Sequence, residues 1–459
     1  MEDWSEAVRA SSQLNAAGEV EKVAALWHER LAQGPPTPGL LVVAARELKR
    51  AEYRRAARLC LAEALRRDPG CVAAYVEWGH MAREEEDWAV ARWAYLQAID
   101  RDPQCVLAHQ ALAYVYEELG QWEEAQRHRD RGFSAAIWQA PFARPGALRV
   151  LEIVSASRGN MPTDSWLQAG PYQVTTVVAE YWRPSRDLGT YDVVVNRVAD
   201  ADAAPLALAQ SKAMLRQASC PVLNPPGAIE RTARALLPHL VKDLPAVLAA
   251  PVARLRSLDV RPWLDAVGWL ERGPVLVRAP GFHGGRYLER AGTMAEVQHI
   301  LARFPEIVLI MPWLDTRRND GWFRKYRAFI VGEALYPVHA ARARHWKVHD
   351  FTGARGVESQ AEEKAFLTCP AETIGAEHWA NLHRLRQRLG LDIGGIDFTV
   401  DRDGRLVVFE ANAAMTPPAP RGTAERVAAA RAIHHALAQL VDTAASHRDN
   451  GVTVVSSPP

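Results

Sequence analysis

The chain has 459 residues, more than one hydrophobic core usually organises, so two or three domains are expected. Its 55 Lys and Arg balance 54 Asp and Glu, which gives no basic excess of the kind that indicates nucleic-acid binding. No apolar run is long enough to cross a membrane, and the first residues lack the basic and apolar regions of a secretory signal. The five cysteines form no CxxC pair, which argues against a disulfide framework or a zinc site. These features predict a cytoplasmic protein that binds neither nucleic acid nor membrane.

The N-terminal part of the chain repeats itself every 34 residues or so. Identical residues recur at this distance: Cys71 and Cys105, Ala74 and Ala108, Trp88 and Trp122, and Ala91 and Ala125. A weaker copy is expected at roughly residues 3–35. The period and the helical punctuation resemble a tetratricopeptide array. That resemblance implies an all-α domain over residues 1–137 with a groove that binds a peptide or protein partner; the alternative is that these helices only cap or dimerise the rest of the chain.

The middle segment begins after the sequence PFARP, which starts at Pro141. The runs LRVLEIVSAS, YQVTTVVAEYW and YDVVVNRVAD are rich in β-branched residues and alternate with helical stretches. Such alternation predicts a small parallel α/β unit. No GxxxxGK[ST] sequence occurs, so a P-loop is not expected.

A glycine-rich hairpin is expected between Gly273 and Gly292. One strand ends at Arg278, a loop containing Gly284 and Gly285 follows, and a second strand starts near Arg286. Glycines let backbone N–H groups approach phosphate oxygens, and an arginine on the strand adds a fixed positive charge. An ordinary hairpin remains the alternative.

A basic stretch follows a buried strand and a proline-containing hinge that run from Glu306 to Thr316. Between Asp315 and Asp350 the chain has eight Lys or Arg against four acids. Phosphates and carboxylates are the natural counterparts of such a local excess, although a solvated basic face is the simpler alternative. Arg327 opens the apolar strand RAFIVGEALYPV, which favours a specific role for this residue.

The last hairpin, GGIDFTVDRDGRLVVFEANAAM, carries two acids on facing strands. Asp403-Gly404 favours a two-residue type I′ turn, which would pair Asp397 with Glu410, Gly395 with Asn412, Phe398 with Phe409, and Val400 with Val407. Facing carboxylates repel unless a positive charge lies between them. Two carboxylates and an amide oxygen suit Mg²⁺. The alternatives are a solvated outer face or one carboxylate paired with an arginine from elsewhere.

Taken in order, these parts resemble the ATP-grasp superfamily from about residue 148 to residue 441. The most specific match is Asp397 followed by Glu410-Ala411-Asn412. Within the family the chain looks most like the carboxylate–amine ligases, such as D-alanine–D-alanine ligase and the ribosomal-protein glutamate ligases. The resemblance implies a multidomain chain: the repeat array, an α/β pre-ATP-grasp domain at residues 147–250, an α+β ATP-grasp fold at 251–441, and a flexible tail at 445–459.

The resemblance also implies roles for individual residues. Asp397, Glu410 and Asn412 would hold Mg²⁺ ions that bridge the phosphates of ATP. Arg327 would steady the acyl phosphate, with Lys325 as a second catalytic cation on the same strand. The expected ATP-binding residues are Arg231, Arg278, His283, Gly284, Gly285, Met311, Trp313 and Leu314.

Two departures from the family bear on function. Many relatives have a Glu in the hinge, where this chain has Met311-Pro312, and the loop SRGNMPTDSW matches no specific relative. The leading hypothesis is an ADP-forming ligase that joins a carboxylate to an amine, with one substrate a peptide or protein recruited by the repeats. The competing hypothesis is a scaffold or regulatory protein whose degenerate ATP-grasp domain only senses nucleotide. A third is phosphoryl transfer to an acceptor that is not a carboxylate, for which His283 is a candidate.

Overall fold

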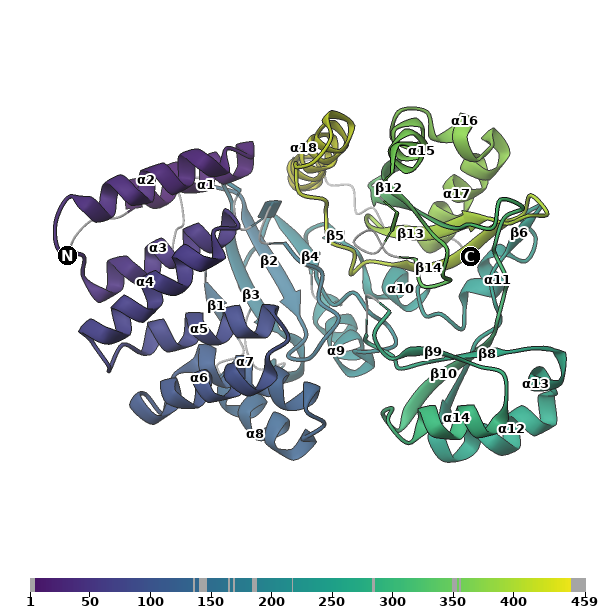
Figure 1. The fold of residues 1–459 in the computed structure, drawn as a ribbon, viewed down its shortest axis with the longest axis horizontal. Coiled ribbons are helices and arrows are strands. Elements are labelled where there is room, and N and C mark those ends of the chain that lie inside the picture. The colour runs from purple at the N-terminus through teal and green to yellow at the C-terminus, as the bar shows by residue number, and fades with distance from the viewer. Residues whose placement is uncertain are drawn as a thin grey trace. The chain divides into compact units, whose positions relative to one another are not determined.

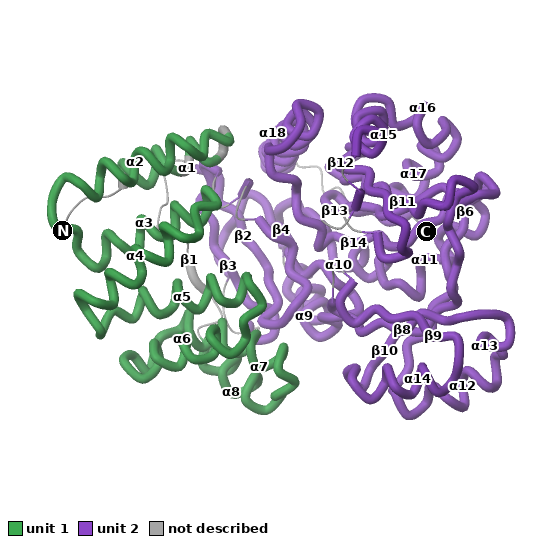
Figure 2. Tube along the Cα trace, in the orientation of Figure 1, with its two compact units in different colours: residues 1–138 green, residues 139–459 purple. Residues whose placement is uncertain are grey.

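The computed structural model divides into two compact units, Met1–Trp138 and Gln139–Pro459, coloured separately in Figure 2. It describes residues 5–134, 137–139, 147–163, 166–167, 170–183, 188–216, 218–282, 285–348, 353–354 and 356–446. Within these residues, no helix is both long and apolar enough to cross a membrane. The boundaries expected at residues 137, 147, 250 and 441 stay predictions.

The first unit consists of helix pairs (Figure 1). Its helices are α1 (Ser5–Ala17), α2 (Val20–Ala32), α3 (Pro38–Arg50), α4 (Arg54–Arg67), α5 (Val72–Glu84), α6 (Trp88–Arg101), α7 (Val106–Glu118) and α8 (Trp122–Phe133). The second helices of successive pairs begin at Val20, Arg54, Trp88 and Trp122, each 34 residues after the last. The predicted all-α repeat array is therefore confirmed, and a helix pair occupies the region of the weak first copy.

The repeating residues have a local structural role. Ala57, Ala91 and Ala125 are fully buried at equivalent places, where only a small side chain lets paired helices approach. Asp68 and Asp102 each end a helix and accept a hydrogen bond from the backbone two residues on, at 2.8 and 3.0 Å. The 34-residue period in the sequence therefore reflects the same packing arrangement, repeated in each helix pair.

The described residues of the second unit form three sheets. In the first, β3 (Gln173–Val178), β2 (Arg149–Val154), β4 (Val193–Asn196) and β5 (Val222–Leu223) lie side by side and pair in parallel. Helices η2 (Ala179–Tyr181) and α9 (Pro205–Leu215) belong to its connections, and β1 (Ile137–Gln139) spans the boundary between the two units. The predicted parallel α/β arrangement is confirmed.

The second sheet is antiparallel, in the order β7 (Ala253–Arg256), β10 (Ile307–Pro312), β8 (Val275–Arg278), β9 (Leu288–Ala291). Helices α12 (Val260–Val267), α13 (Trp269–Arg272) and α14 (Met294–Leu301) lie on one face of it, after η3 (Ser257–Asp259) (Figure 1). Val277 and Ile310 from the strands pack with Leu264 and Val297 from the helices in one apolar core. The glycine-rich hairpin is formed by β8 and β9.

The third sheet has the order β12 (Ala334–Ala343), β11 (Phe323–Val331), β13 (Ile393–Val400), β14 (Leu406–Asn412), β6 (Val247–Leu248). The remaining helices are α10 (Pro226–Glu230), α11 (Leu237–Val241), α15 (Val357–Thr368), α16 (Pro370–Ile374), α17 (Ala376–Leu389) and α18 (Ala424–Ser446). Tyr326 of β11 and Phe398 of β13 pack against Phe366 of α15, with ring centroids 5.0 and 6.1 Å away. Because strand side chains alternate between faces, the neighbouring Lys325, Arg327 and Asp397 turn to the opposite face.

The predicted order, an all-α repeat array followed by α/β and α+β regions, is confirmed. Helix α18 reaches Ser446, and residues 447–459 of the expected tail lie outside the described residues.

Candidate active site

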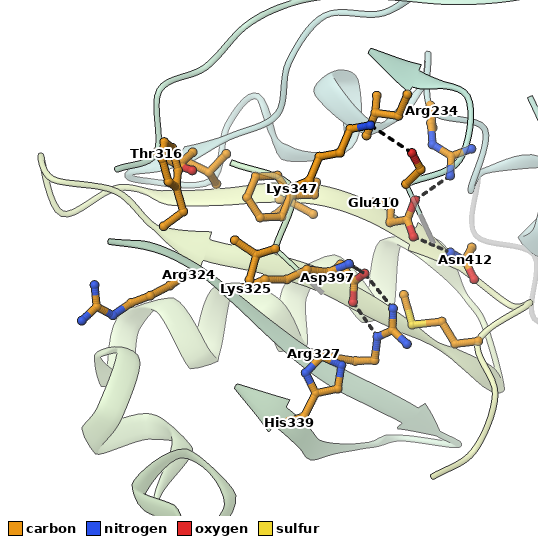
Figure 3. Close-up of a pocket in the computed structure, with 18 of the residues that line it drawn as sticks. Arg234, Thr316, Arg324, Lys325, Arg327, His339, Lys347, Asp397, Glu410 and Asn412 are labelled. Carbon is orange, nitrogen blue, oxygen red and sulfur yellow. Dashed lines mark hydrogen bonds and ion pairs between the residues drawn. The ribbon is translucent and has the colours of Figure 1, made fainter. Parts of the chain in front are cut away.

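A cavity of about 660 Å³ opens between the second and third sheets of the second unit. Leu276 and Arg278 of β8 line it from the second sheet. Lys325, Arg327 and Asp397 line it from the third sheet (Figure 3). Its size falls in the range of small-molecule and cofactor sites. The two hairpins singled out in the sequence therefore face one space.

The last hairpin pairs as predicted at the acids. Asp397 lies opposite Glu410, and Gly395 lies opposite Asn412. Nearer the turn the prediction was wrong: Phe398 pairs with Val408 rather than Phe409, and Val400 pairs with Leu406 rather than Val407.

Two irregularities explain this difference. The turn has three residues between Asp401 and Arg405, whose backbones bond at 3.0 Å, and Gly404 takes a left-handed φ of 75°. That geometry is typical of a three-residue loop ending in a residue with positive φ. A β-bulge between Asp397 and Phe398 then leaves Phe409 as the extra residue of β14. The bulge offsets the longer turn, so the predicted pairing of the acids holds although the predicted turn does not.

A row of ionisable side chains crosses the third sheet. His339 of β12 lies opposite Arg327 of β11, Arg327 lies opposite Asp397 of β13, and Asp397 lies opposite Glu410 of β14. All four line the cavity (Figure 3). Strand pairing alone therefore brings together residues from distant parts of the sequence.

Asp397 is fully buried and held by two cations. Arg327 donates Nε and Nη2 to its two oxygens at 2.7 and 2.8 Å, and Lys325 Nζ lies 2.5 Å from Oδ2. Burial opposes the charged carboxylate, but the cations outweigh it and hold the pKa of Asp397 below its usual range. Of the alternatives stated for the hairpin, the solvated face is excluded for Asp397, and pairing with an arginine is observed.

Glu410 is held from outside its own sheet. Its Oε2 lies 2.5 Å from Arg234 Nη2 and 3.6 Å from Arg278 Nη2. Burial and the neighbouring charge of Arg234 lower the pKa of Arg278 to about 10. For Arg234, burial opposes the charged form, yet Glu410 and two aspartates, Asp200 and Asp202, keep its pKa above the usual value. The two arginines form the cationic side of the cavity that faces β14.

The structure does not bring Arg231 to this site. Arg231 Nε donates to the carbonyl oxygen of Leu389 at 2.8 Å, and the side chain does not line the cavity. Arg234, three residues later, does line it and reaches Glu410. Arg231 and Arg234 are both in the irregular segment after α10, where helical periodicity gives no guide to which arginine turns inward.

The donor set fits a hard divalent cation. Asn412 lies beside Glu410, with its Nδ2 donating to Oε1 at 3.3 Å, while its buried Oδ1 has no hydrogen-bond partner among the described residues. Oxygens of this kind are the ligands that Mg²⁺ prefers. Within the described part of the chain, no three His, Cys, Asp or Glu side chains gather as a metal cluster, so a metal here would depend on the amide as well as the acids.

The expected adenine residues Met311, Trp313 and Leu314 line the cavity, as does Gly285. Trp313 packs edge-on against Trp346, with ring centroids 5.3 Å apart, and Arg290 lies 5.0 Å over its ring. His283 and Gly284 lie outside the described residues.

Several cavity residues were missed at the level of the sequence. They include Arg234, His339, Lys347 and Phe409. Lys347 belongs to the basic excess already noted, and its Nζ lies 3.4 Å from the carbonyl oxygen of Gly285. Phe409 is 40% exposed because the bulge turns it out of the apolar core. Neither the bulge nor the fold of the segment around Arg234 has a local sequence signal.

Comparison with known proteins identifies part of the chain. Residues 94–127 match the family model described as tetratricopeptide repeat. The first unit contains a tetratricopeptide repeat. No curated protein matches the chain.

Among solved structures, the chain is similar to D-alanyl-alanine synthetase A from Vibrio cholerae, with 15% identity, 66% of this chain and 99% of that chain covered, and a TM-score of 0.43. It is similar to D-alanine–D-alanine ligase from Bacillus anthracis, with 12% identity, coverage of 67% and 100%, and a TM-score of 0.42. It is also similar to a RimK domain ATP-grasp protein from Sphaerobacter thermophilus, with 15% identity, coverage of 64% and 98%, and a TM-score of 0.40. By name these neighbours are a synthetase, a ligase and an ATP-grasp protein, and the proposed function rests on the geometry of the site.

Proposed function

We propose that the chain is an ATP-dependent, ADP-forming ligase that joins a carboxylate to an amine through an acyl phosphate. The observation that carries the proposal is the arrangement of Asp397, Glu410 and Asn412 in a cavity into which arginines and lysines converge from two sheets. In such a partly enclosed space, the basic side chains would bind a polyphosphate and the acids would bind a divalent cation.

The charge of the cavity supports a nucleotide. Its side chains include five cations around the two acids: Arg234, Arg278, Lys325, Arg327 and Lys347. A triphosphate would compensate this excess. Met311, Trp313 and Phe409 supply the apolar surface that a purine base needs.

Asp397, Glu410 and Asn412 are the residues that would hold Mg²⁺. When bound, Mg²⁺ neutralises phosphate charge during phosphoryl transfer.

The chemistry follows from the chain's own residues. A carboxylate becomes a good acyl donor when the γ-phosphoryl group of ATP is transferred to it, releasing ADP. Arg278, Arg327 and Lys325 would hold the phosphoryl oxygens in place and balance their charge. The walls of the cavity must exclude water, because an acyl phosphate would otherwise hydrolyse before the amine attacks.

We further propose that one substrate is a peptide or protein recruited by the tetratricopeptide repeats, and that the enzyme acts in the cytoplasm. Such arrays present a groove to an extended partner segment. A role in bacterial peptide modification or peptide natural-product biosynthesis would fit this combination.

One observation favours a second candidate function. Both oxygens of Asp397 are engaged by Arg327 and Lys325, so this acid already has compensating cations without any metal. A scaffold or regulatory protein that only senses nucleotide would not need Asp397 to bind a catalytic metal, and these ion pairs would be sufficient for it.

The test begins with calorimetric binding of ATP with and without Mg²⁺, using the intact chain and the double variant Asp397→Asn/Glu410→Gln. Glu289→Gln is a matched control, because Glu289 pairs with Arg303 at 2.8 Å on an exposed surface away from the cavity. Magnesium-dependent binding that is lost only in the double variant is expected. ADP release with pools of carboxylates and amines then separates a ligase from a nucleotide sensor, which would bind ATP and release no ADP. An intact chain that binds no ATP would contradict both functions.

A further inference from the structure

A ligase of the proposed kind needs a group that removes a proton from the amine. Amines such as a lysine side chain are largely protonated near neutral pH, and an ammonium group has no lone pair with which to attack a carbonyl carbon. The acceptor of that proton has no assignment so far. The inference below rests on the proposed function.

The acids of the cavity are poorly suited to this task. Asp397 forms ion pairs with Arg327 and Lys325, and its pKa lies below the usual range, so it is a weak proton acceptor. Glu410 is held by Arg234 at 2.5 Å and belongs to the set that would bind the metal. Their cationic partners have no acceptor capacity near neutral pH.

His339 differs from all of these groups. Among the described side chains that line the cavity, it is the one imidazole. It projects from β12 beside Arg327, which is its cross-strand partner (Figure 3). A neutral imidazole accepts a proton at a ring nitrogen and gives it up again within the physiological pH range.

Several charged side chains lie near His339 in the cavity. Arg327 and Lys325 project from the neighbouring strand β11, Asp397 lies beyond Arg327 on β13, and Arg421 and Arg426 line the same cavity from the segment after β14. An ammonium substrate among these cations would be disfavoured relative to its neutral amine. The cations that would hold the acyl phosphate therefore favour release of the proton from the amine, and because they also disfavour an imidazolium, His339 would pass the proton on rather than retain it.

We propose that His339 is the general base that activates the amine substrate. The ammonium N–H gives its proton to the imidazole, and the freed lone pair attacks the acyl carbon. The new C–N bond forms, the bond from carbon to the phosphate oxygen breaks, and inorganic phosphate leaves with that electron pair. The second proton of the attacking nitrogen goes to the departing phosphate, which leaves a neutral amide.

The test compares two nucleophiles on the full-length chain, in the presence of ATP and Mg²⁺. Each of the proteinogenic amino acids is offered as the carboxylate, with either hydroxylamine or an amino acid amide as the nucleophile. Hydroxylamine is a weak base that is already neutral near pH 7, so it traps an acyl phosphate as a hydroxamate without help from a general base. His339→Gln should therefore reduce amide formation by about 100-fold or more, while hydroxamate formation changes less than about tenfold.

A control variant and a pH profile complete the design. His299→Gln removes an exposed imidazole from α14, outside the cavity, and should change neither rate. In His339→Gln the amide rate should recover as the pH rises toward the pKa of the amine, which a purely structural loss would not produce. Equal loss of hydroxamate and amide, or no loss of amide, would overturn the role of His339, and so would a wild-type chain that forms hydroxamate but activates no amine. A wild-type chain that releases no ADP and forms no hydroxamate would overturn the proposed function as well.

Discussion

The two acids of the cavity face each other, yet they are held in different ways. Asp397 is neutralised within its own sheet, by Arg327 and Lys325 of the adjacent strand. Glu410 is neutralised across the cavity, by Arg234 and Arg278 from other parts of the second unit. The first arrangement depends on strand register and the second on how the two walls of the cavity come together. Asp397 should therefore matter most for stability, and the arginines around Glu410 most for binding.

The largest expected effect is on stability, from Asp397→Asn. The substitution keeps the size of the side chain but leaves two cations, Arg327 and Lys325, beside a buried neutral group. Breaking a buried ion pair in this way costs about 3–5 kcal/mol. Chemical denaturation should show this loss in the free energy of unfolding, whereas Asp403→Asn, at the exposed turn, should stay within about 0.5 kcal/mol of the wild type.

The pH dependence of the stability difference between wild type and Asp397→Asn tests the same ion pairs. Because the pKa of Asp397 is lower in the folded state than its ordinary value of about 3.9, its contribution to stability is complete above that value. The contribution should be lost as the pH falls below about 4. The stability difference between wild type and Asp397→Asn should thus be constant from neutral pH down to mildly acidic pH and shrink only in acid. A difference that already shrinks near neutral pH would contradict the assignment.

Next in size is the effect of Arg234→Met on nucleotide affinity. Losing a charged hydrogen-bond donor to an anionic ligand costs about 1.5–3 kcal/mol, or roughly 10- to 100-fold in the dissociation constant of ATP. Arg231→Met is the matched control, because that arginine caps Leu389 and does not line the cavity. Calorimetry on the folded variants should show weaker ATP binding for Arg234→Met alone. Equal losses of ATP affinity in both variants would indicate that Arg231 also contributes to the binding site.

A smaller effect is expected from Gly404→Ala in the turn of the last hairpin. Its φ of 75° disfavours any residue with a Cβ, at a cost of about 1–2 kcal/mol. No atom outside the turn lies within contact distance of an added Cβ, so the cost should come from the backbone alone. Thermal denaturation should show the loss while ATP affinity is unchanged. A loss of affinity would mean that the turn, and not the bulge, governs the position of the acids.

The smallest effect is expected from Phe409→Ala. The ring is already 40% exposed, so its removal should barely change the free energy of unfolding. If it contacts the base of ATP, losing that apolar contact should weaken binding by about 1 kcal/mol, roughly fivefold. Competition between ATP and inorganic triphosphate would check this, since only the nucleotide should bind more weakly.

The sequence was sufficient wherever structure depends on local repetition or on strand pairing. The 34-residue period of Trp88 and Trp122 follows from one helix packing used again, and the placement of Asp397 and Glu410 on adjacent strands follows from the two β-branched runs around the turn. Their direct pairing also needs the bulge, which the sequence does not signal. It was insufficient where tertiary folding decides which side chain turns inward. Arg231 was expected at the site and Arg234 is there, since the segment after α10 has no regular period. The roles assigned to these residues stay predictions.

The strand pairing of the last hairpin has an evolutionary consequence. The pairs Phe398–Val408, Thr399–Val407 and Val400–Leu406 lie between the acids and the turn, so the turn residues take no part in aligning Asp397 with Glu410. A homologue could therefore gain or lose residues at the tip of this hairpin and keep the two acids face to face. Length variation is expected at the tip and not between the acids and Asp401.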